Sequence, residues 1–519
     1  MFPTIQHFSR TAALSAALLL GATSCKDFLD VDNRSNLTPD NFYKTAAQAQ
    51  SAIDGLYNNL RLVQNGTGYG EAIWVTLELM TQHATTLGQS FNNSQIINQS
   101  IDPANPFFSN VWNSAYRGIG AANLAITKIP AIDMPDAKKK ALLGEAYFIR
   151  AYLYNLLVRL YGDVPLLTDP VTGPGPTLYP ARSPKADVYK LIISDLQAAE
   201  SAGLPVVDRT GRISQSAAKA LLADVYLTTA GYPMQLKENY QKAADKAAEV
   251  IDAGNYPLFV TKTVKTKLNP VQQDSAVYIN LHDNAHKNQG ELILQAQYAT
   301  GIAGNAIGPL VVPFFSGVTA YNDELGALVP TEEFYNTYEP GDLRAKEQQF
   351  YFSKYPAFKN PSAGIVDFKR HALYKYFHVE SALNKALDND ENWTLIRMPE
   401  VMLIYAEAIN EVGAAPSKAY AQINAIRSRA MVPALAGLNQ EQFRQAVWKE
   451  RYHELAYENK AYFDIQRTRK TYDVKNNKFV DVIGFKGELG PAFQEKYLLW
   501  GIPSSEINNN KQLTQNPGW

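Results

Sequence analysis

Cysteine is almost absent from this sequence of 519 residues, which contains only Cys25 and therefore forms no internal disulfide. Neither sign of charge is in excess, because 49 lysines and arginines are balanced by 50 aspartates and glutamates. This balance does not indicate a surface that attracts nucleic acid. Without cross-links the folded chain must be stabilised by packing, which suits a large helical body better than a small loop-rich module.

Long apolar runs are also missing, apart from a short one at residues 11–24, directly before Cys25. A membrane-spanning helix needs roughly 20 apolar residues. A short apolar run that follows Arg10 and ends in small residues is instead typical of a secretory signal peptide, here residues 1–24. We expect lipid to be attached to the thiol of Cys25, where each buried methylene contributes about 0.8 kcal/mol to membrane anchoring. The alternative is an ordinary signal peptide followed by a buried free thiol.

Apolar residues recur at helical spacing in several segments, which predicts a mainly α-helical fold. The expected helices of the N-terminal half are residues 137–161, 184–202, 214–231 and 240–253. The third and fourth combine small residues with tyrosines, which predicts a tetratricopeptide-like hairpin. The same pattern returns in residues 395–412 and 419–429.

Two long insertions separate these helical pairs, so the sequence does not predict a plain solenoid. Residues 64–106 are rich in Asn, Gln, Thr and Gly, and residues 258–393 mix Gly and Pro with Tyr and Phe. A strand-like run is present at residues 291–295. We expect irregular structure in both insertions, and irregular segments carry sites more often than repeated helices do.

No metal site, cofactor or phosphate loop is predicted. His282 and His286 lie four positions apart, but no glutamate follows the first histidine, so we interpret them as ordinary solvated surface. Residues 388–392 imitate the first positions of a calcium loop. Trp393 stands where the bend glycine belongs and Pro399 where the bidentate glutamate belongs, which excludes an EF-hand and leaves an irregular calcium site as an alternative.

Four acidic residues in helix-rich blocks are candidates for an acid and base pair of the kind that hydrolyses glycosides. They are Glu407, Glu450, Glu454 and Asp464. Arginines at positions 427, 429, 451 and 467 lie close to them in sequence, so ion pairs and helix contacts explain them better. We therefore predict no catalytic residue.

Several blocks, taken together, carry a family resemblance. They are residues 24–30, 111–116, 122–123, 150–154, 160–166, 397–400, 406–408, 424–429, 450–455, 463–464, 500–503 and 515–519. The chain resembles the SusD/RagB family of cell-surface nutrient-binding lipoproteins, although Gly501 replaces the usual proline. The resemblance implies a single SusD-like domain over residues 25–519, with an N-terminal helical half (25–257) and a loop-rich segment followed by C-terminal helical pairs (258–519).

The resemblance also implies a location and partners. The protein would be anchored to the outer membrane through Cys25 and face the cell exterior. It would bind oligosaccharide or polysaccharide and deliver it to a SusC-like TonB-dependent transporter, without catalysis. Peptide capture, as in RagB-like members, is the nearest alternative. A surface glycoside hydrolase and a tetratricopeptide scaffold that binds only protein are the others.

A glycan site needs flat aromatic rings beside amide, hydroxyl or carboxylate groups. Two loops meet this demand, the first in a region where family members carry ligand contacts. The predicted ligand-binding residues are His83, Phe91, Asn92 and Asn93 in the first loop and Tyr298, Phe314, Phe315 and Tyr321 in the second. Trp74 and Trp393 lie outside the resembling blocks, so we also expect them to be available to a ligand.

The lipid anchor is tested by Cys25→Ser. We expect this variant to fold normally but to leave the membrane fraction, because the acyl chains and not the folded body hold the protein there. Fractionation of cells that lack the transporter measures this directly. Retention of the variant in their membranes would contradict lipidation at Cys25.

Overall fold

The computed structural model describes residues 42–63, 73–81, 83–87, 91–171, 173, 178–260, 277–313, 315–320, 324–377, 383 and 388–519. Cys25 and the predicted signal peptide lie outside these residues, as do Phe314 and Tyr321. The backbone of Phe91 is described, but its side chain is not.

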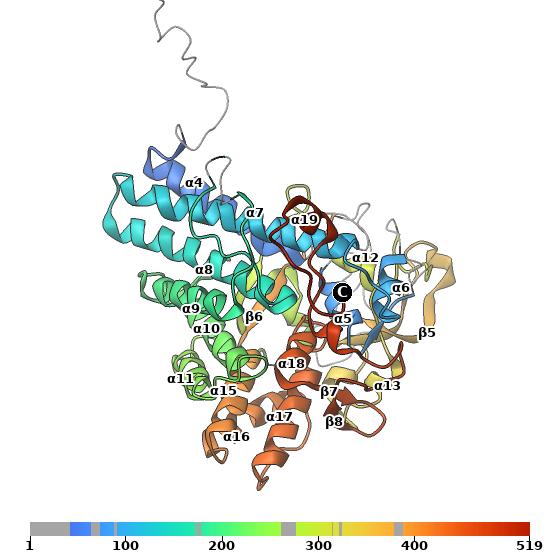
Figure 1. The fold of residues 1–519 in the computed structure, drawn as a ribbon. Coiled ribbons are helices and arrows are strands. Elements are labelled where there is room, and N and C mark those ends of the chain that lie inside the picture. Colours follow the sequence, from blue (N-terminus) through green and yellow to red (C-terminus); the bar gives the residue numbers. More distant parts are fainter. Residues whose placement is uncertain are drawn as a thin grey trace, which may run out of the picture.

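Pairs of helices stack along one side of the molecule, and loops and small sheets cover the other side (Figure 1). Each helix from α7 to α11 packs against the next, and α11 then packs against α15, which also contacts α16 and α17. The stacked helices are α4 (Ala46–Leu56), α7 (Pro106–Lys128), α8 (Asp136–Tyr161), α9 (Lys185–Ser201), α10 (Gln215–Ala230), α11 (Asn239–Asp252), α15 (Met398–Val412), α16 (Ser417–Arg429) and α17 (Gln440–Glu454). The predicted mainly α-helical fold is confirmed.

The predicted hairpin of α10 and α11 is present because small side chains let the two helices approach closely. The hydroxyl of Ser214 caps α10 by accepting a hydrogen bond from the Ala217 amide at 3.1 Å. Ala217 and Ala223 on α10 and Ala243 on α11 are fully buried. The helical period and the cap together account for this pair.

The expected helix at 395–412 begins later than the sequence suggested. Residues Trp393–Arg397 form strand β6, which pairs antiparallel with β2 (Leu292–Ala296), so the strand-like run is confirmed. Pro399 then lies in the first turn of α15, where a missing amide hydrogen costs nothing. The apolar run thus crosses from a strand into a helix, which periodicity alone did not separate.

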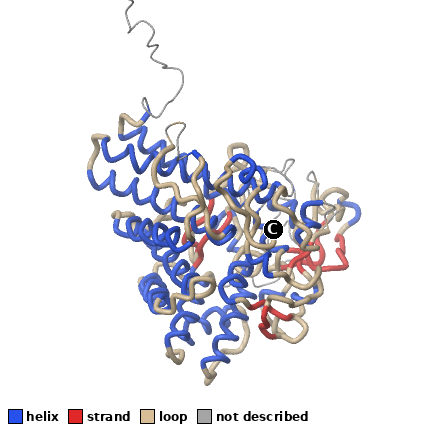
Figure 2. Tube along the Cα trace, viewed as in Figure 1, coloured by secondary structure: helices blue, strands red, loops and turns tan. Residues whose placement is uncertain are grey.

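The two insertions contain more regular structure than expected. The first holds α5 (Ile73–Leu79), β1 (Ala84–Thr85) and α6 (Phe91–Ile97). Further short elements follow in the second insertion and toward the C-terminus: α12 (Ile307–Val311), β3 (Val329–Pro330), α13 (Glu332–Tyr335), β4 (Tyr351–Pro356), β5 (Ile365–Leu373), α18 (Ala461–Thr468), β7 (Lys470–Asp473), β8 (Lys478–Asp481) and α19 (Ser504–Asn509). The described strands form separate two-stranded sheets among the loops (Figure 2).

Trp74 and Trp393 lie in the core, so the expectation that they are available to a ligand is wrong. Their exposed fractions are 0% and 2%, and their ring centroids are 5.3 Å apart. Trp393 also stacks on Tyr376 at 5.0 Å. Helix α5 and strand β6, which carry the two tryptophans, come from different parts of the chain and meet at this aromatic cluster.

No helix in the described ranges has the combination of length and apolarity that a membrane span requires.

The helical layer is tested at Tyr154 of α8, which is fully buried and exchanges two hydrogen bonds with the backbone of Leu167, at 2.9 and 2.7 Å. We expect Tyr154→Ala to lower the free energy of unfolding by about 3–5 kcal/mol through the cavity it leaves. Tyr154→Phe should cost about 1–3 kcal/mol, because it leaves the Leu167 amide unpaired. Urea denaturation measures both variants.

Tyr179→Ala is the matched control, since Tyr179 is 49% exposed and its loss should change stability by less than about 0.5 kcal/mol. A Tyr154→Ala variant as stable as this control would contradict the assignment of Tyr154 to the core.

Candidate ligand-binding site

The two predicted ligand loops lie side by side because a short antiparallel ladder joins them. In this ladder Ala84 and Thr85 of β1 face Pro330 and Val329 of β3. The pairing continues beyond the strands, where the amide of Leu87 donates to the Gly326 carbonyl at 2.7 Å. Segments more than 200 residues apart in sequence are therefore held together beneath the candidate site.

His83 directly precedes β1 and is fully buried. Its Nε2 contacts the carboxylate of Glu78, and its ring packs edge-on against Tyr457 at 4.9 Å. The backbone carbonyl of His83 accepts a hydrogen bond from the Thr331 amide at 3.0 Å. His83 thus connects the first loop to the core, and the burial of its side chain does not support direct contact with a ligand.

Two more of the predicted residues are buried. Asn93 on α6 is 1% exposed, and Tyr298 is 4% exposed. The guanidinium of Arg61 lies 5.8 Å from the Tyr298 ring centroid, and the Tyr298 amide donates to Asn392 at 2.9 Å. These contacts hold Tyr298 within the folded body. Asn92, also on α6, is partly exposed.

Phe315 is the predicted residue that the described structure presents to solvent, with 80% of its surface exposed. Its φ angle is +53°, in the left-handed region that a bulky side chain rarely adopts. Such a conformation costs roughly 1–3 kcal/mol and persists only where the surroundings impose it. An aromatic ring held in solvent by a strained backbone is a candidate for ligand contact.

A buried carboxylate imposes the shape of this loop. Glu324 accepts hydrogen bonds from the amides of Gly317 and Thr319, at 2.6 and 2.8 Å. On the other side of the loop, the Phe358 amide donates to the Val318 carbonyl at 3.1 Å. No periodic pattern in the sequence points to Glu324, because its partners are backbone groups of an irregular loop.

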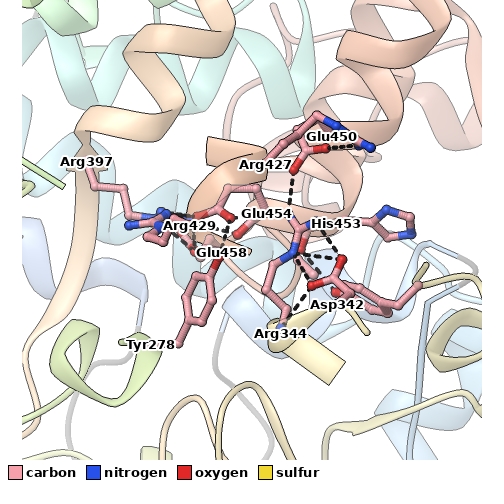
Figure 3. A network of polar contacts seen from close by, with 12 residues as sticks. Tyr278, Asp342, Arg344, Arg397, Arg427, Arg429, Glu450, His453, Glu454 and Glu458 are labelled. Carbon is pink, nitrogen blue, oxygen red and sulfur yellow. Dashed lines mark hydrogen bonds and ion pairs between the residues drawn. The ribbon is translucent and has the colours of Figure 1, made fainter. Parts of the chain in front are cut away.

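Glu450, Glu454 and Glu458 belong to a buried network of ion pairs (Figure 3). Glu407 and Asp464 pair instead with Arg451 and Arg467. Glu454 accepts hydrogen bonds from Arg397 at 2.7 Å and from Arg344 at 3.3 Å, and it also pairs with Arg429. Burial alone would raise the pKa of Glu454, but the three guanidinium charges outweigh it and hold the pKa below its usual value. Such a carboxylate stays ionised and is a poor proton donor.

The ion pairs expected from the sequence are confirmed. They join Arg427 to Glu450 at 2.9 Å, Arg429 to Glu454, Arg451 to Asp464 at 3.1 Å, and Arg467 to Glu407. Each of the four candidate acids is thus bound to at least one arginine. Nearby arginines lower the pKa of both Glu454 and Asp464, whereas the acid catalyst of glycoside hydrolysis needs a raised pKa.

The two histidines of the possible metal pair face different carboxylates. Nδ1 of His282 lies 3.1 Å from Glu391, and Nδ1 of His286 lies 3.0 Å from Asp283. His282 is 9% exposed and therefore buried, which corrects its interpretation as solvated surface. Within the described ranges, no three His, Cys, Asp or Glu residues lie close enough together to hold a metal ion.

Carboxylates of the acidic run at residues 388–392 also form hydrogen bonds within the protein. Asp388 accepts a hydrogen bond from the Gly301 amide at 2.7 Å, and Asp390 accepts one from Asn284 at 2.8 Å. These carboxylates therefore join two segments of the second insertion to each other.

The fold and the site define an α-helical repeat protein that carries a loop-built candidate binding surface on one side. The chain belongs to the SusD family, whose model matches residues 217–519. A second family model, described as "Starch-binding associating with outer membrane", matches residues 27–227.

Known proteins resemble the chain over nearly its whole length. SusD-like protein P2 of Formosa agariphila is 29% identical, over 97% of this chain and 98% of that protein. A SusD superfamily protein from Parabacteroides distasonis, solved by crystallography, is 33% identical with a TM-score of 0.83, over 93% of this chain and all of that one. Surface glycan-binding protein A of Bacteroides thetaiotaomicron, solved with laminarihexaose, shares the fold at 19% identity and a TM-score of 0.70, over 91% of this chain and all of that one.

The ion network generates a prediction about pH. Burial opposes ionisation of Glu458, but Arg397 and Lys375 outweigh burial and lower its pKa well below the usual value. A lowered native pKa contributes stability that is complete above the unfolded pKa of about 4.3 and is lost as the pH falls below it. We expect the free energy of unfolding to fall between pH 5 and 3, with roughly 2 kcal/mol of the fall due to Glu458.

Glu458→Gln should therefore show a shallower dependence on pH, in addition to lower stability at pH 7. Glu333→Gln, at an exposed position, serves as the control. Denaturant unfolding at several pH values measures all three proteins. The same pH slope in Glu458→Gln and in the unmodified protein would contradict the stabilising role of this ion pair.

Proposed function

We propose that the protein is a lipid-anchored receptor on the outer membrane that binds oligosaccharide and delivers it to a SusC-like TonB-dependent transporter. The observation that carries the proposal is the exposed, strained Phe315 on a loop anchored by Glu324, in a chain that belongs to the SusD family. The description of the family model that matches residues 27–227 supports both a glycan as the ligand and the outer membrane as the location.

The proposed site combines the ring of Phe315 with polar groups of the neighbouring first loop, including Asn92. Sugars present polarised C–H groups to an aromatic face and hydroxyls to amides, so this combination suits a glycan. Phe91, Phe314 and Tyr321 remain proposed contacts, predicted from the sequence. In this proposal His83, Asn93 and Tyr298 hold the loops in place from below.

In this proposal the protein binds oligosaccharide as a receptor and does not hydrolyse it. The support for this is that its helix-borne carboxylates are engaged by arginines, as Glu454 is by Arg397 and Arg429. Turnover of a bound oligosaccharide by the purified protein would contradict this part of the proposal.

Delivery to a transporter is proposed from family membership. Isolation of the lipidated protein in mild detergent, followed by identification of the barrel protein that accompanies it, tests this step. Absence of any TonB-dependent transporter from that preparation would favour the scaffold alternative.

Ligand binding is tested at Phe315. We expect Phe315→Ala to weaken oligosaccharide binding about tenfold, near 1.4 kcal/mol, because a shallow site depends on a few stacked rings. The melting temperature should change little, since the ring is 80% exposed. Calorimetric titration with maltohexaose and laminarihexaose, within a wider oligosaccharide panel, measures the affinity.

Three further variants make this test specific. Phe315→Gly also removes the ring but relieves the positive φ, so it should lose binding while gaining slight stability. Phe315→Trp keeps an aromatic face and should retain binding. Tyr179→Ala removes an exposed ring elsewhere and should bind normally. Unchanged oligosaccharide binding in Phe315→Gly would contradict the assignment of the site to Phe315. Binding of peptides, with no binding of any sugar in the panel, would establish peptide capture.

A further inference from the structure

A cleft of about 520 Å³ lies between the helical layer and the C-terminal segment. Its walls come from the ends of α8, α9, α10 and α18 and from residues 495–518, and none of its lining residues belongs to the two predicted ligand loops. Pockets for small molecules range from roughly 300 to 1,000 Å³, so this cleft is large enough for a mono- or disaccharide.

Positive side chains dominate the lining of this cleft. Five cationic residues line it and a single carboxylate, Glu495, faces them. Carboxylates elsewhere pair with two of the five, since Arg159 lies 2.9 Å from Asp224 and Arg467 lies 2.7 Å from Asp464. Lys185 is 3.8 Å from Asp163.

The other two cations, Arg469 and Lys496, have no carboxylate within 4 Å in the described part of the chain. The Arg469 guanidinium lies 5.3 Å from the Tyr232 ring centroid, and its Nη1 is buried without a hydrogen-bond acceptor. The Lys496 ammonium lies 5.2 Å from the Trp519 ring centroid. No nitrogen of the Arg469 guanidinium donates a hydrogen bond within the described ranges, so this cation is available to pair with a bound anion.

Neutral hydroxyls of the same cleft also lack partners. Tyr189 and Thr228 line it, and neither side-chain hydroxyl forms a hydrogen bond within the described ranges. Burial raises the pKa of Tyr189, which keeps its hydroxyl protonated and able to donate. The cleft therefore offers two cations and two neutral hydroxyls, with the aromatic rings of Tyr232 and Phe463 beside them.

A structural role explains part of this arrangement. Arg467 lies in the last turn of α18 and Arg469 at its C-cap, where positive charge interacts favourably with the helix dipole. The dipole does not explain why Nη1 of Arg469 has no acceptor, nor why Lys496, outside any α-helix, lines the same cleft.

We infer that this cleft binds an acidic sugar, a uronic acid unit alone or in a disaccharide. Its carboxylate would pair with Arg469 and Lys496, and its hydroxyls would bond to Tyr189 and Thr228. An inorganic anion would use the cations but not the hydroxyls, and a neutral sugar would use the hydroxyls but not the cations. The inference is independent of the proposed function of the two loops.

The probe for this site is α-1,4-digalacturonic acid, titrated calorimetrically into the full chain. We expect binding that weakens as salt is added, whereas the neutral galactose disaccharide should not bind detectably. Arg469→Gln should weaken binding at least tenfold, and Arg469→Lys should weaken it less. Arg117→Gln changes an exposed arginine of α7 outside the cleft and should leave binding unchanged.

Two further variants distinguish a sugar site in this cleft from a general attraction of anions to the protein surface. Lys496→Gln and Tyr189→Phe should each weaken digalacturonate binding and keep the melting temperature, so the test stands even if Arg469→Gln fails to fold. Tyr179→Ala, outside both sites, should leave digalacturonate binding unchanged. The inference is overturned if digalacturonate does not bind, if Lys496→Gln binds it normally, or if sulfate or triglutamate binds as tightly.

Discussion

One buried network of ion pairs determines how the two sides of this molecule fit together. Arg397, at the end of β6, bonds to Glu454 of α17 and to Glu458 just beyond it, and it also reaches Glu291 in the second insertion. Arg344 of the same insertion bonds to Glu454. Removing one partner from a buried ion pair costs about 3–5 kcal/mol, because an uncompensated charge remains. The insertion is therefore fixed to the helical layer.

This attachment gives the loops a rigid base, which a strained site requires. A phenylalanine with a φ of +53° would relax if its loop were loosely held. The Glu324 carboxylate fixes the loop that carries Phe315, the β1–β3 ladder joins this loop to the first loop, and His83 connects the first loop to the core. The ion pairs thus hold the insertion, the ladder holds the two loops together, and the loop in turn holds the exposed ring of Phe315.

The sequence predicted the parts of this structure that have a period and missed those that depend on contacts across the chain. The helices around Tyr154 and the α10–α11 hairpin were predicted, because each buries a regular apolar face. Trp393 was misjudged, since its burial depends on Trp74 and Tyr376, which are remote in sequence. The candidate loops were predicted by composition, but composition did not separate the exposed Phe315 from the buried His83.

Arginine, rather than lysine, dominates the network for a physical reason. A guanidinium has five donors in a fixed plane, so Arg397 can bond to three carboxylates at once and remain charged. Lys375, buried beside Glu458, illustrates the alternative, because burial lowers its pKa to about 8 despite that carboxylate. A network built on lysine would lose charge just above neutral pH. In a chain without disulfides, arginine keeps these long-range links between segments across the pH range in which the carboxylates are ionised.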